Sequence, residues 1–204
     1  PCYSENDHQG FPVLYLLHGL SYTNDQWLRL GLQNHMDDLI AQGELAPFII
    51  ILPEESPIEP PQMSSFPDIL TKELIPWIDN HYNTLAEKPY RGIGGLSRGA
   101  AWAVQIGFEH PSLFCCVGAH SLPLFQADGG KINRWLTQNP IEDLPRVLID
   151  IGRDDQEWPT AQSFANQLDS AHVPHEWYLF NSGHTESYWS DHLDLYLQWY
   201  ARNW

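Results

Sequence analysis

Gly95-Leu96-Ser97-Arg98-Gly99 is the most informative segment of this 204-residue chain. It follows a short strand-like run at residues 90–94 and precedes a helix-forming run that begins at Ala100. A tight turn between a strand and a helix strains the backbone of its central residue, and only glycine-sized neighbours let the helix pass close to the strand. The segment therefore predicts a sharp strand–turn–helix with Ser97 at its tip.

Segments far from this turn indicate the sheet around it. The continuous apolar run at residues 13–17 is typical of a strand buried on both faces of a parallel sheet, and it ends at His18-Gly19-Leu20. Strand-like runs at 146–151 and 175–180 are followed by Asp155 and His184. Because the carboxyl ends of parallel strands meet at one edge of a sheet, these side chains are expected to gather there.

Strand-like and helix-like runs alternate along the whole chain. This alternation predicts an α/β fold, with a mostly parallel sheet and helices on both faces, in a single domain over residues 1–204. The segment between His120 and Pro145 is the only room for a lid, and its shortness predicts an open site. The expected strands lie near residues 13–17, 47–52, 90–94, 113–119, 146–151 and 175–180, and the expected helices near 25–42, 66–84, 98–109, 130–138, 159–171 and 186–203.

A G-x-S-x-G box between a strand and a helix is the nucleophile elbow of α/β-hydrolases, which use the chain order serine, acid, histidine. Ser97 is then the nucleophile, His184 its base and Asp155 the acid that orients the imidazole. The alternatives are that Ser97 only caps a helix and that Asp154 is the acid. Asp150, inside its strand, is expected to be structural.

The same geometry predicts an oxyanion hole from two backbone N–H groups, those of Leu20 and Arg98. Aromatic side chains near these loops are candidates to stack a phenolic or sugar ring of a substrate. They are Tyr22, Trp158, Tyr188 and Trp189. For Trp189, as for Trp27, packing in the core is the favoured interpretation.

Several motifs resemble the putative-esterase family of α/β-hydrolases, which includes feruloyl and acetylxylan esterases and S-formylglutathione hydrolases. They are Val13-Leu14-Tyr15-Leu16-Leu17-His18-Gly19, Glu73-Leu74-Ile75-Pro76-Trp77-Ile78, Gly94-Gly95-Leu96-Ser97-Arg98-Gly99 and His110-Pro111-Ser112-Leu113-Phe114. The resemblance implies an α/β-hydrolase fold and favours Asp155 over Asp154. Members carry a strand or hairpin ahead of Pro1-Cys2-Tyr3, so this chain is expected to lack the leading N-terminal strands. Arg98 stands where the family often has an uncharged residue, and it is expected to meet an anionic substrate group or to point to solvent.

Composition limits the possible partners. The formal net charge is −16, which disfavours nucleic acid and anionic membrane surfaces, and no apolar stretch approaches the length of a membrane span.

His172-x-x-His175 lacks companion ligands, so neither a metal nor another cofactor is expected. Cys115 and Cys116 lie in a strand-like run and are expected to be small core residues. Low lysine with nine tryptophans leans toward an extracytoplasmic protein, with a cytoplasmic one still open.

The sequence thus predicts a serine carboxylesterase that hydrolyses short or aromatic acyl esters, of the acetyl or feruloyl kind, on a small molecule or a carbohydrate. Leu20-Ser21-Tyr22-Thr23 also resembles the loop of S-formylglutathione hydrolases, so a thioesterase is an alternative. Acyl transfer to an alcohol is another, because alcohols compete with water for an acyl-enzyme. A non-catalytic binding module with the same fold is the alternative from a different class.

Overall fold

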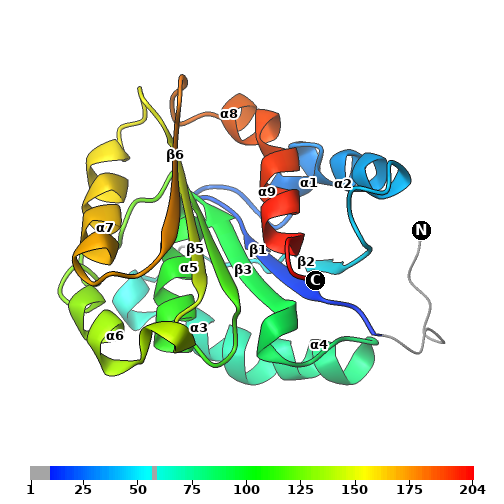
Figure 1. The fold of residues 1–204 in the computed structure, drawn as a ribbon, viewed down its shortest axis with the longest axis horizontal. Helices are drawn as coiled ribbons and strands as arrows, with labels where there is room; N and C mark the ends of the chain where they lie inside the picture. Colours follow the sequence, from blue (N-terminus) through cyan, green and yellow to red (C-terminus); the bar gives the residue numbers. More distant parts are fainter. Residues whose placement is uncertain (1–9, 57–58) are drawn as a thin grey trace.

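The computed structural model describes residues 10–56 and 59–204, and a six-stranded sheet runs through its middle (Figure 1). All neighbouring strands are parallel, in the order β2-β1-β3-β4-β5-β6. This arrangement confirms the α/β-hydrolase fold class expected from the sequence. The strands are β1 (Val13–Leu17), β2 (Ile49–Ile51), β3 (Arg91–Leu96), β4 (Cys116–His120), β5 (Arg146–Gly152) and β6 (His175–Phe180).

Helices cover both faces of the sheet (Figure 1). One layer packs on a core built around α5 and holds α3 (Phe66–Asp68), α4 (Ile75–His81), α5 (Arg98–Glu109), α6 (Ile132–Gln138) and α7 (Trp158–Ser170). The other layer packs on a second core and holds α1 (Gln26–Arg29), α2 (Leu32–Ala41), α8 (Glu186–Asp191) and α9 (Leu193–Ala201). A π-helical stretch, η2 (Ile69–Leu74), joins α3 to α4, and short 3₁₀ turns are η1 (Pro61–Met63), η3 (Lys88–Tyr90) and η4 (Ile141–Asp143).

The burial of each strand follows from its place in the sheet. Every residue of β1, β3 and β4 is buried, as expected for strands covered by helices on both faces. The two edge strands, β2 and β6, are only half-buried along their whole length. The fully apolar run at 13–17 is therefore a central strand, as its composition predicted.

The structure departs from the expected elements in two helices and in one strand. The helix expected over 25–42 is broken at Gly31, whose φ of +99° leaves helical geometry, and the one expected over 186–203 is broken at His192. Strand β4 begins only at Cys116, three residues later than expected, because the chain turns between His110 and Leu113. Cys115 is therefore half-buried in a bend rather than a core strand residue.

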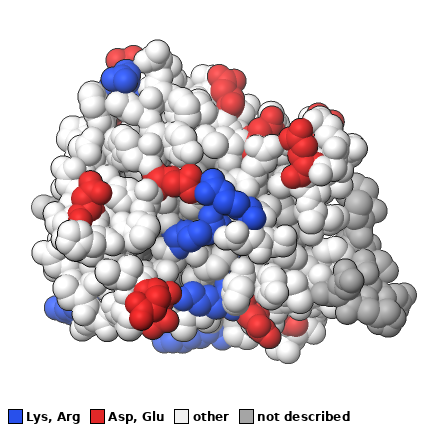
Figure 2. Space-filling model, in the orientation of Figure 1, with Lys and Arg blue, Asp and Glu red and all other residues white. Residues whose placement is uncertain are grey.

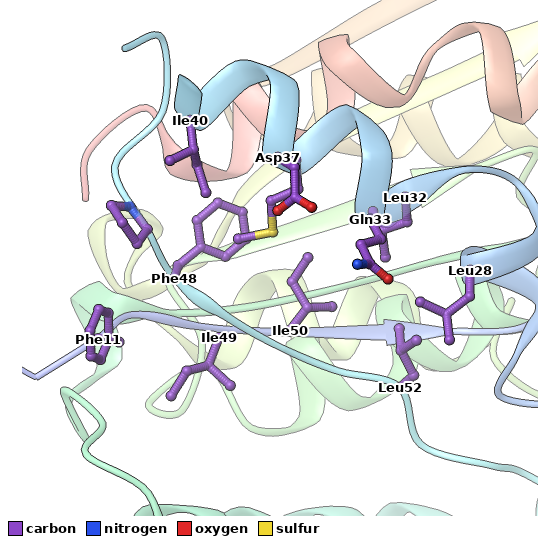
Figure 3. Close-up of a pocket in the computed structure, with 12 residues that line it drawn as sticks. Phe11, Leu28, Leu32, Gln33, Asp37, Ile40, Phe48, Ile49, Ile50 and Leu52 are labelled. Atoms are coloured by element: carbon purple, nitrogen blue, oxygen red, sulfur yellow. The ribbon is translucent and has the colours of Figure 1, made fainter. Parts of the chain in front are cut away.

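The surface has both charged and apolar features. On the face shown in Figure 2, acidic side chains are scattered while Lys and Arg side chains gather near the middle. No helix among the described residues is long and apolar enough to cross a membrane. An apolar groove of about 290 Å³ lies between α2 and the edge strand β2, two strands away from β3 (Figure 3). Its lining includes Phe11, Leu28, Leu32, Met36, Ile40, Phe48, Ile49, Ile50 and Leu52.

Candidate active site

Ser97 occupies the tight turn between β3 and α5. Its φ of +53° and ψ of −124° are unusual for a residue other than glycine, and such strain concentrates at functional sites. A Cβ on Gly95 would lie 2.4 Å from the Gly99 carbonyl carbon, and a Cβ on Gly99 would lie 2.3 Å from the Leu17 oxygen. Both glycines are required because the helix passes so close to strands β3 and β1.

Ser97, His184 and Asp155 form one hydrogen-bonded chain. His184 Nε2 lies 2.9 Å from Ser97 Oγ, and His184 Nδ1 lies 2.9 Å and 3.0 Å from the two carboxylate oxygens of Asp155. Asp155 follows β5 and His184 follows β6, so the parallel strands deliver both side chains to the edge where Ser97 stands. Asp154, the competing acid, is exposed and takes no part in this chain.

The carboxylate of Asp155 is stabilised in its charged form. Burial raises its pKa, but hydrogen bonds from His184, from the backbone N–H of Glu157 and from the hydroxyl of Ser121 outweigh that effect and hold the pKa below its usual value. A carboxylate that stays ionised can keep the proton of His184 on Nδ1 and leave Nε2 free to accept one from Ser97.

Ser121 is a site residue that the sequence did not reveal. Its hydroxyl donates to Asp155 and accepts the indole N–H of Trp189 at 3.1 Å. Its φ of +54° turns the side chain toward the triad just beyond the end of β4. A serine with no motif around it gives no sequence signal, and only its position after a strand could have suggested a role.

The two predicted oxyanion donors lie at the same edge of the sheet. The N–H of Arg98 belongs to the first residue of α5, where backbone N–H groups have no partner inside the helix. The loop after β1 is held by Gln26, which is fully buried and accepts the N–H of Gly19 at 2.8 Å. The N–H of Gly19 is thus already bonded, and the predicted donor is that of the next peptide, Leu20. Gln26 is a second residue for which the sequence gave no signal.

The side chain of Arg98 does neither of the things expected of it. It neither points to solvent nor stays free for a substrate anion, because it forms a two-pronged ion pair with Glu55 at 2.7 and 2.8 Å. The guanidinium is 13% exposed, the carboxylate 4%, and the rings of Trp102 and Phe125 flank the guanidinium. The positive charge next to Ser97 is thus already neutralised within the chain.

Glu55 also links the two loops that carry the predicted oxyanion donors. Its backbone N–H donates to His18 Nε2 at 2.9 Å, while His18 Nδ1 lies 2.9 Å from the Gly19 carbonyl oxygen. Donation from Nδ1 to that carbonyl assigns the tautomer of the imidazole. The loop that carries Glu55 therefore holds the loop before Leu20 through His18 and the nucleophile turn through Arg98.

Of the four aromatic candidates, two are wrong as ring-stacking residues. Tyr188 is 1% exposed and its hydroxyl donates to Asp150 at 2.7 Å, so it is a core residue. Trp189 is buried too, with its ring edge-on to that of His184, which agrees with the core alternative. Tyr22 is 39% exposed beside Arg29, and Trp158 is half-buried at the start of α7, so both remain accessible.

A second buried acid–histidine pair lies behind the triad. His120 Nδ1 lies 2.5 Å from Asp150, whose other oxygen accepts the hydroxyls of Tyr188 and Tyr196, each at 2.7 Å. The N–H of Ser97 donates to the carbonyl of His120 at 2.9 Å, so this network supports the nucleophile turn from below. Asp150 thus has the structural position expected for it. Nowhere in the described ranges do three His, Cys, Asp or Glu side chains gather as a metal ion would require.

Comparisons with known proteins find relatives named as esterases. The chain is 34% identical over 112 residues to an endo-1,4-beta-xylanase/feruloyl esterase of Xylanibacter ruminicola, covering 51% of this chain and 15% of that protein. It is 28% identical over 158 residues to an esterase of Mycobacterium tuberculosis, covering 70% of this chain and 31% of the relative. The chain therefore spans less than a third of the length of either curated relative.

Solved structures repeat the fold over nearly the whole chain. A ferulic acid esterase superposes with a TM-score of 0.86 at 25% identity, covering 98% of this chain and 88% of that one. An S-formylglutathione hydrolase of Staphylococcus aureus superposes with a TM-score of 0.75 at 16% identity, covering 94% and 82%, and shows the fold alone. The family model described as "Putative esterase" matches residues 1–200. The elbow, the parallel sheet and this match together place the chain in the putative esterase family.

Proposed function

We propose that the protein is a serine carboxylic ester hydrolase that works through an acyl-enzyme on Ser97. The observation that carries the proposal is the continuous hydrogen-bonded chain Ser97–His184–Asp155 on a strained turn. In such a chain the imidazole accepts the hydroxyl proton as the oxygen attacks, and the carboxylate stabilises the imidazolium that forms.

The reaction then follows from the geometry. Ser97 Oγ attacks the acyl carbon, and the carbonyl oxygen becomes an oxyanion that accepts the N–H groups of Leu20 and Arg98. A donor of this kind lowers the barrier by about 3–4 kcal/mol. His184 returns its proton to the leaving alcohol, and the acyl group stays on Ser97. A water molecule, deprotonated by His184, repeats the attack and releases the acid.

We further propose a short or aromatic acyl group as the substrate, including feruloyl esters of carbohydrates. Two relatives named for feruloyl or ferulic acid esters support this class. Ser97 and His184 are half-buried rather than enclosed, and Tyr22 is accessible beside the loop that supplies Leu20. An aromatic acyl group could stack on that ring, whereas a long alkyl chain needs an apolar tunnel.

Comparing kcat/KM among four substrates tests the substrate class. We expect methyl ferulate and p-nitrophenyl acetate to be hydrolysed faster than p-nitrophenyl palmitate and S-formylglutathione. Tyr22→Ala should raise KM for methyl ferulate more than for the acetate, since an aromatic pair contributes about 0.5–1.5 kcal/mol beyond the area it buries. Tyr82→Ala, with a similarly exposed ring directly after the end of α4, is the matched control. A clear preference for S-formylglutathione would instead identify a thioesterase.

A further inference from the structure

Cys115 and Cys116 bring two sulfur atoms together at the end of the sheet opposite to Ser97. The atoms lie 3.3 Å apart although the residues are neighbours in sequence. Successive side chains of a strand point to opposite faces, but Cys115 precedes β4 in a bend, so that rule does not separate this pair. The backbone of Cys115 is held on both sides. Its N–H donates to the carbonyl of Arg91, and its carbonyl accepts the N–H of Arg146, both at 2.9 Å.

The two thiols differ in accessibility. Cys116 is completely buried, whereas Cys115 is half-buried and lines a cavity of about 330 Å³ that is open to solvent. Lys88, Glu142 and Arg146 are the charged residues that line the same cavity. A dissolved reagent can therefore reach the sulfur of Cys115 first, and the sulfur of Cys116 only through it.

A half-buried cation, Arg146, favours an anionic sulfur at this place. The guanidinium of Arg146 stacks 4.6 Å from the ring centre of Trp199, and its Nη2 donates to two backbone carbonyls at 3.4 Å. Its Nη1 is buried with no hydrogen-bond partner within the described part of the chain. A hydrogen bond from Cys116 is the main cause that lowers the pKa of Cys115 to about 7. Trp204 and Arg146 contribute to this lowering, while burial acts against it. Burial raises the pKa of Cys116.

We propose that Cys115 and Cys116 form a redox-active vicinal dithiol, which a small-molecule disulfide converts into a disulfide between the two adjacent residues. The Cys115 thiolate attacks one sulfur of the small disulfide, forms a mixed disulfide and releases one small thiolate. Cys116 Sγ then attacks Cys115 Sγ, its proton passes to the departing thiolate, and the second small thiol leaves. Two protein thiols are oxidised, and one small disulfide is reduced to two thiols.

The product should be easily reversed. The two Cα atoms stand about 3.8 Å apart across one peptide bond, closer than the usual range for disulfide-linked residues, and strained disulfides are the readily reduced ones. The pair is also separate from the proposed catalysis. Cys116 and His120 mark the two ends of β4, about 13 Å apart at the rise of a strand. The inference is therefore independent of the proposed function.

Mass spectrometry of the full chain, carrying Cys2→Ser to leave only this pair, tests the proposal. After treatment with oxidised glutathione, the peptide that contains Cys115 and Cys116 should weigh two hydrogen atoms less, and dithiothreitol should restore both thiols. Stable glutathione adducts, disulfide-linked dimers or unreacted thiols would each overturn the proposal. The reaction should be faster above pH 7 than below it, because the thiolate is the attacking form.

Two single variants separate the roles of the sulfurs. In Cys116→Ala, Cys115 should still react but stop at a persistent glutathione adduct, whereas in Cys115→Ala the buried Cys116 should stay reduced. Circular dichroism shows whether each variant is folded. Phenylarsine oxide, which needs two close thiols, should bind the reduced protein that has both cysteines and neither single variant. Equal binding to a single variant would contradict the pairing.

Discussion

At the scale of the residue, the site depends on which of two adjacent aspartates contacts the histidine. Both carboxylate oxygens of Asp155 lie within 3.0 Å of His184 Nδ1, whereas Asp154 is exposed. Tyr188 turns away from the site. Its place in the sequence, four residues after His184, suggested contact with substrate, but its side chain points into the core toward Asp150. The direction of a side chain depends on tertiary packing, which a single sequence does not display.

The neighbouring aspartates provide a matched pair of variants. Asp155→Asn removes the charge that stabilises the imidazolium, and we expect kcat to fall by roughly 10⁴ with little change in folding. Asp154→Asn, one residue away and exposed, should keep nearly full activity. Steady-state kinetics on a p-nitrophenyl ester measure both variants. A reversed ranking would assign the acid to Asp154.

Ser121 should act as a positioning residue for Asp155. Ser121→Ala removes a hydrogen bond to a charged group, which contributes about 1.5–3 kcal/mol, so kcat should fall roughly 10- to 100-fold. Because Ser121 helps to lower the pKa of Asp155, the pKa of that carboxyl should be higher in the variant than in the wild type, which NMR titration of the Asp155 carboxyl carbon measures. Trp189→Phe keeps the ring beside His184 but removes the N–H donor to Ser121, and should have a smaller effect. An unchanged pKa of Asp155 together with unchanged kcat in Ser121→Ala would refute the positioning role.

At the scale of elements, the patterns predicted which strands exist better than where helices stop. The strand-like runs identified all six strands, and β1 was the clearest because a strand covered on both faces is apolar throughout. The breaks at Gly31 and His192 were missed, since the apolar pattern continues through both. Glu55 lies in the loop that follows β2, and its side chain reaches from there to Arg98 beside Ser97. Such a long-range ion pair leaves no local sequence pattern.

The Glu55–Arg98 pair should couple the loop to the nucleophile turn. Glu55→Gln or Arg98→Met alone leaves a buried charge without its partner, which costs about 3–5 kcal/mol of stability. The double variant should recover most of this loss, because neither charge remains. Thermal unfolding and kcat of all four proteins complete the cycle, with Glu54→Gln as the exposed neighbouring control. Strictly additive losses would show that the two side chains are not coupled.

At the scale of the whole molecule, one parallel sheet explains how the distant parts of the site meet. Ser97, Asp155 and His184 are 58 and 29 residues apart in chain order, yet each follows the carboxyl end of its own strand. The chain order and the strand patterns therefore predicted the assembly of the triad. They did not predict the supporting contacts of Gln26, Glu55 and Ser121, which depend on how loops fold over the sheet edge.

The central claim is that Ser97 carries the acyl group, and covalent labelling tests it most directly. A fluorophosphonate probe should modify one serine, and peptide mapping should identify it as Ser97. Labelling should be absent in Ser97→Ala and strongly slowed in His184→Ala, because the hydroxyl needs its base. Ester hydrolysis in Ser97→Ala should be lower by roughly 10⁶. A label on another serine, or ester turnover that survives in Ser97→Ala, would contradict the account.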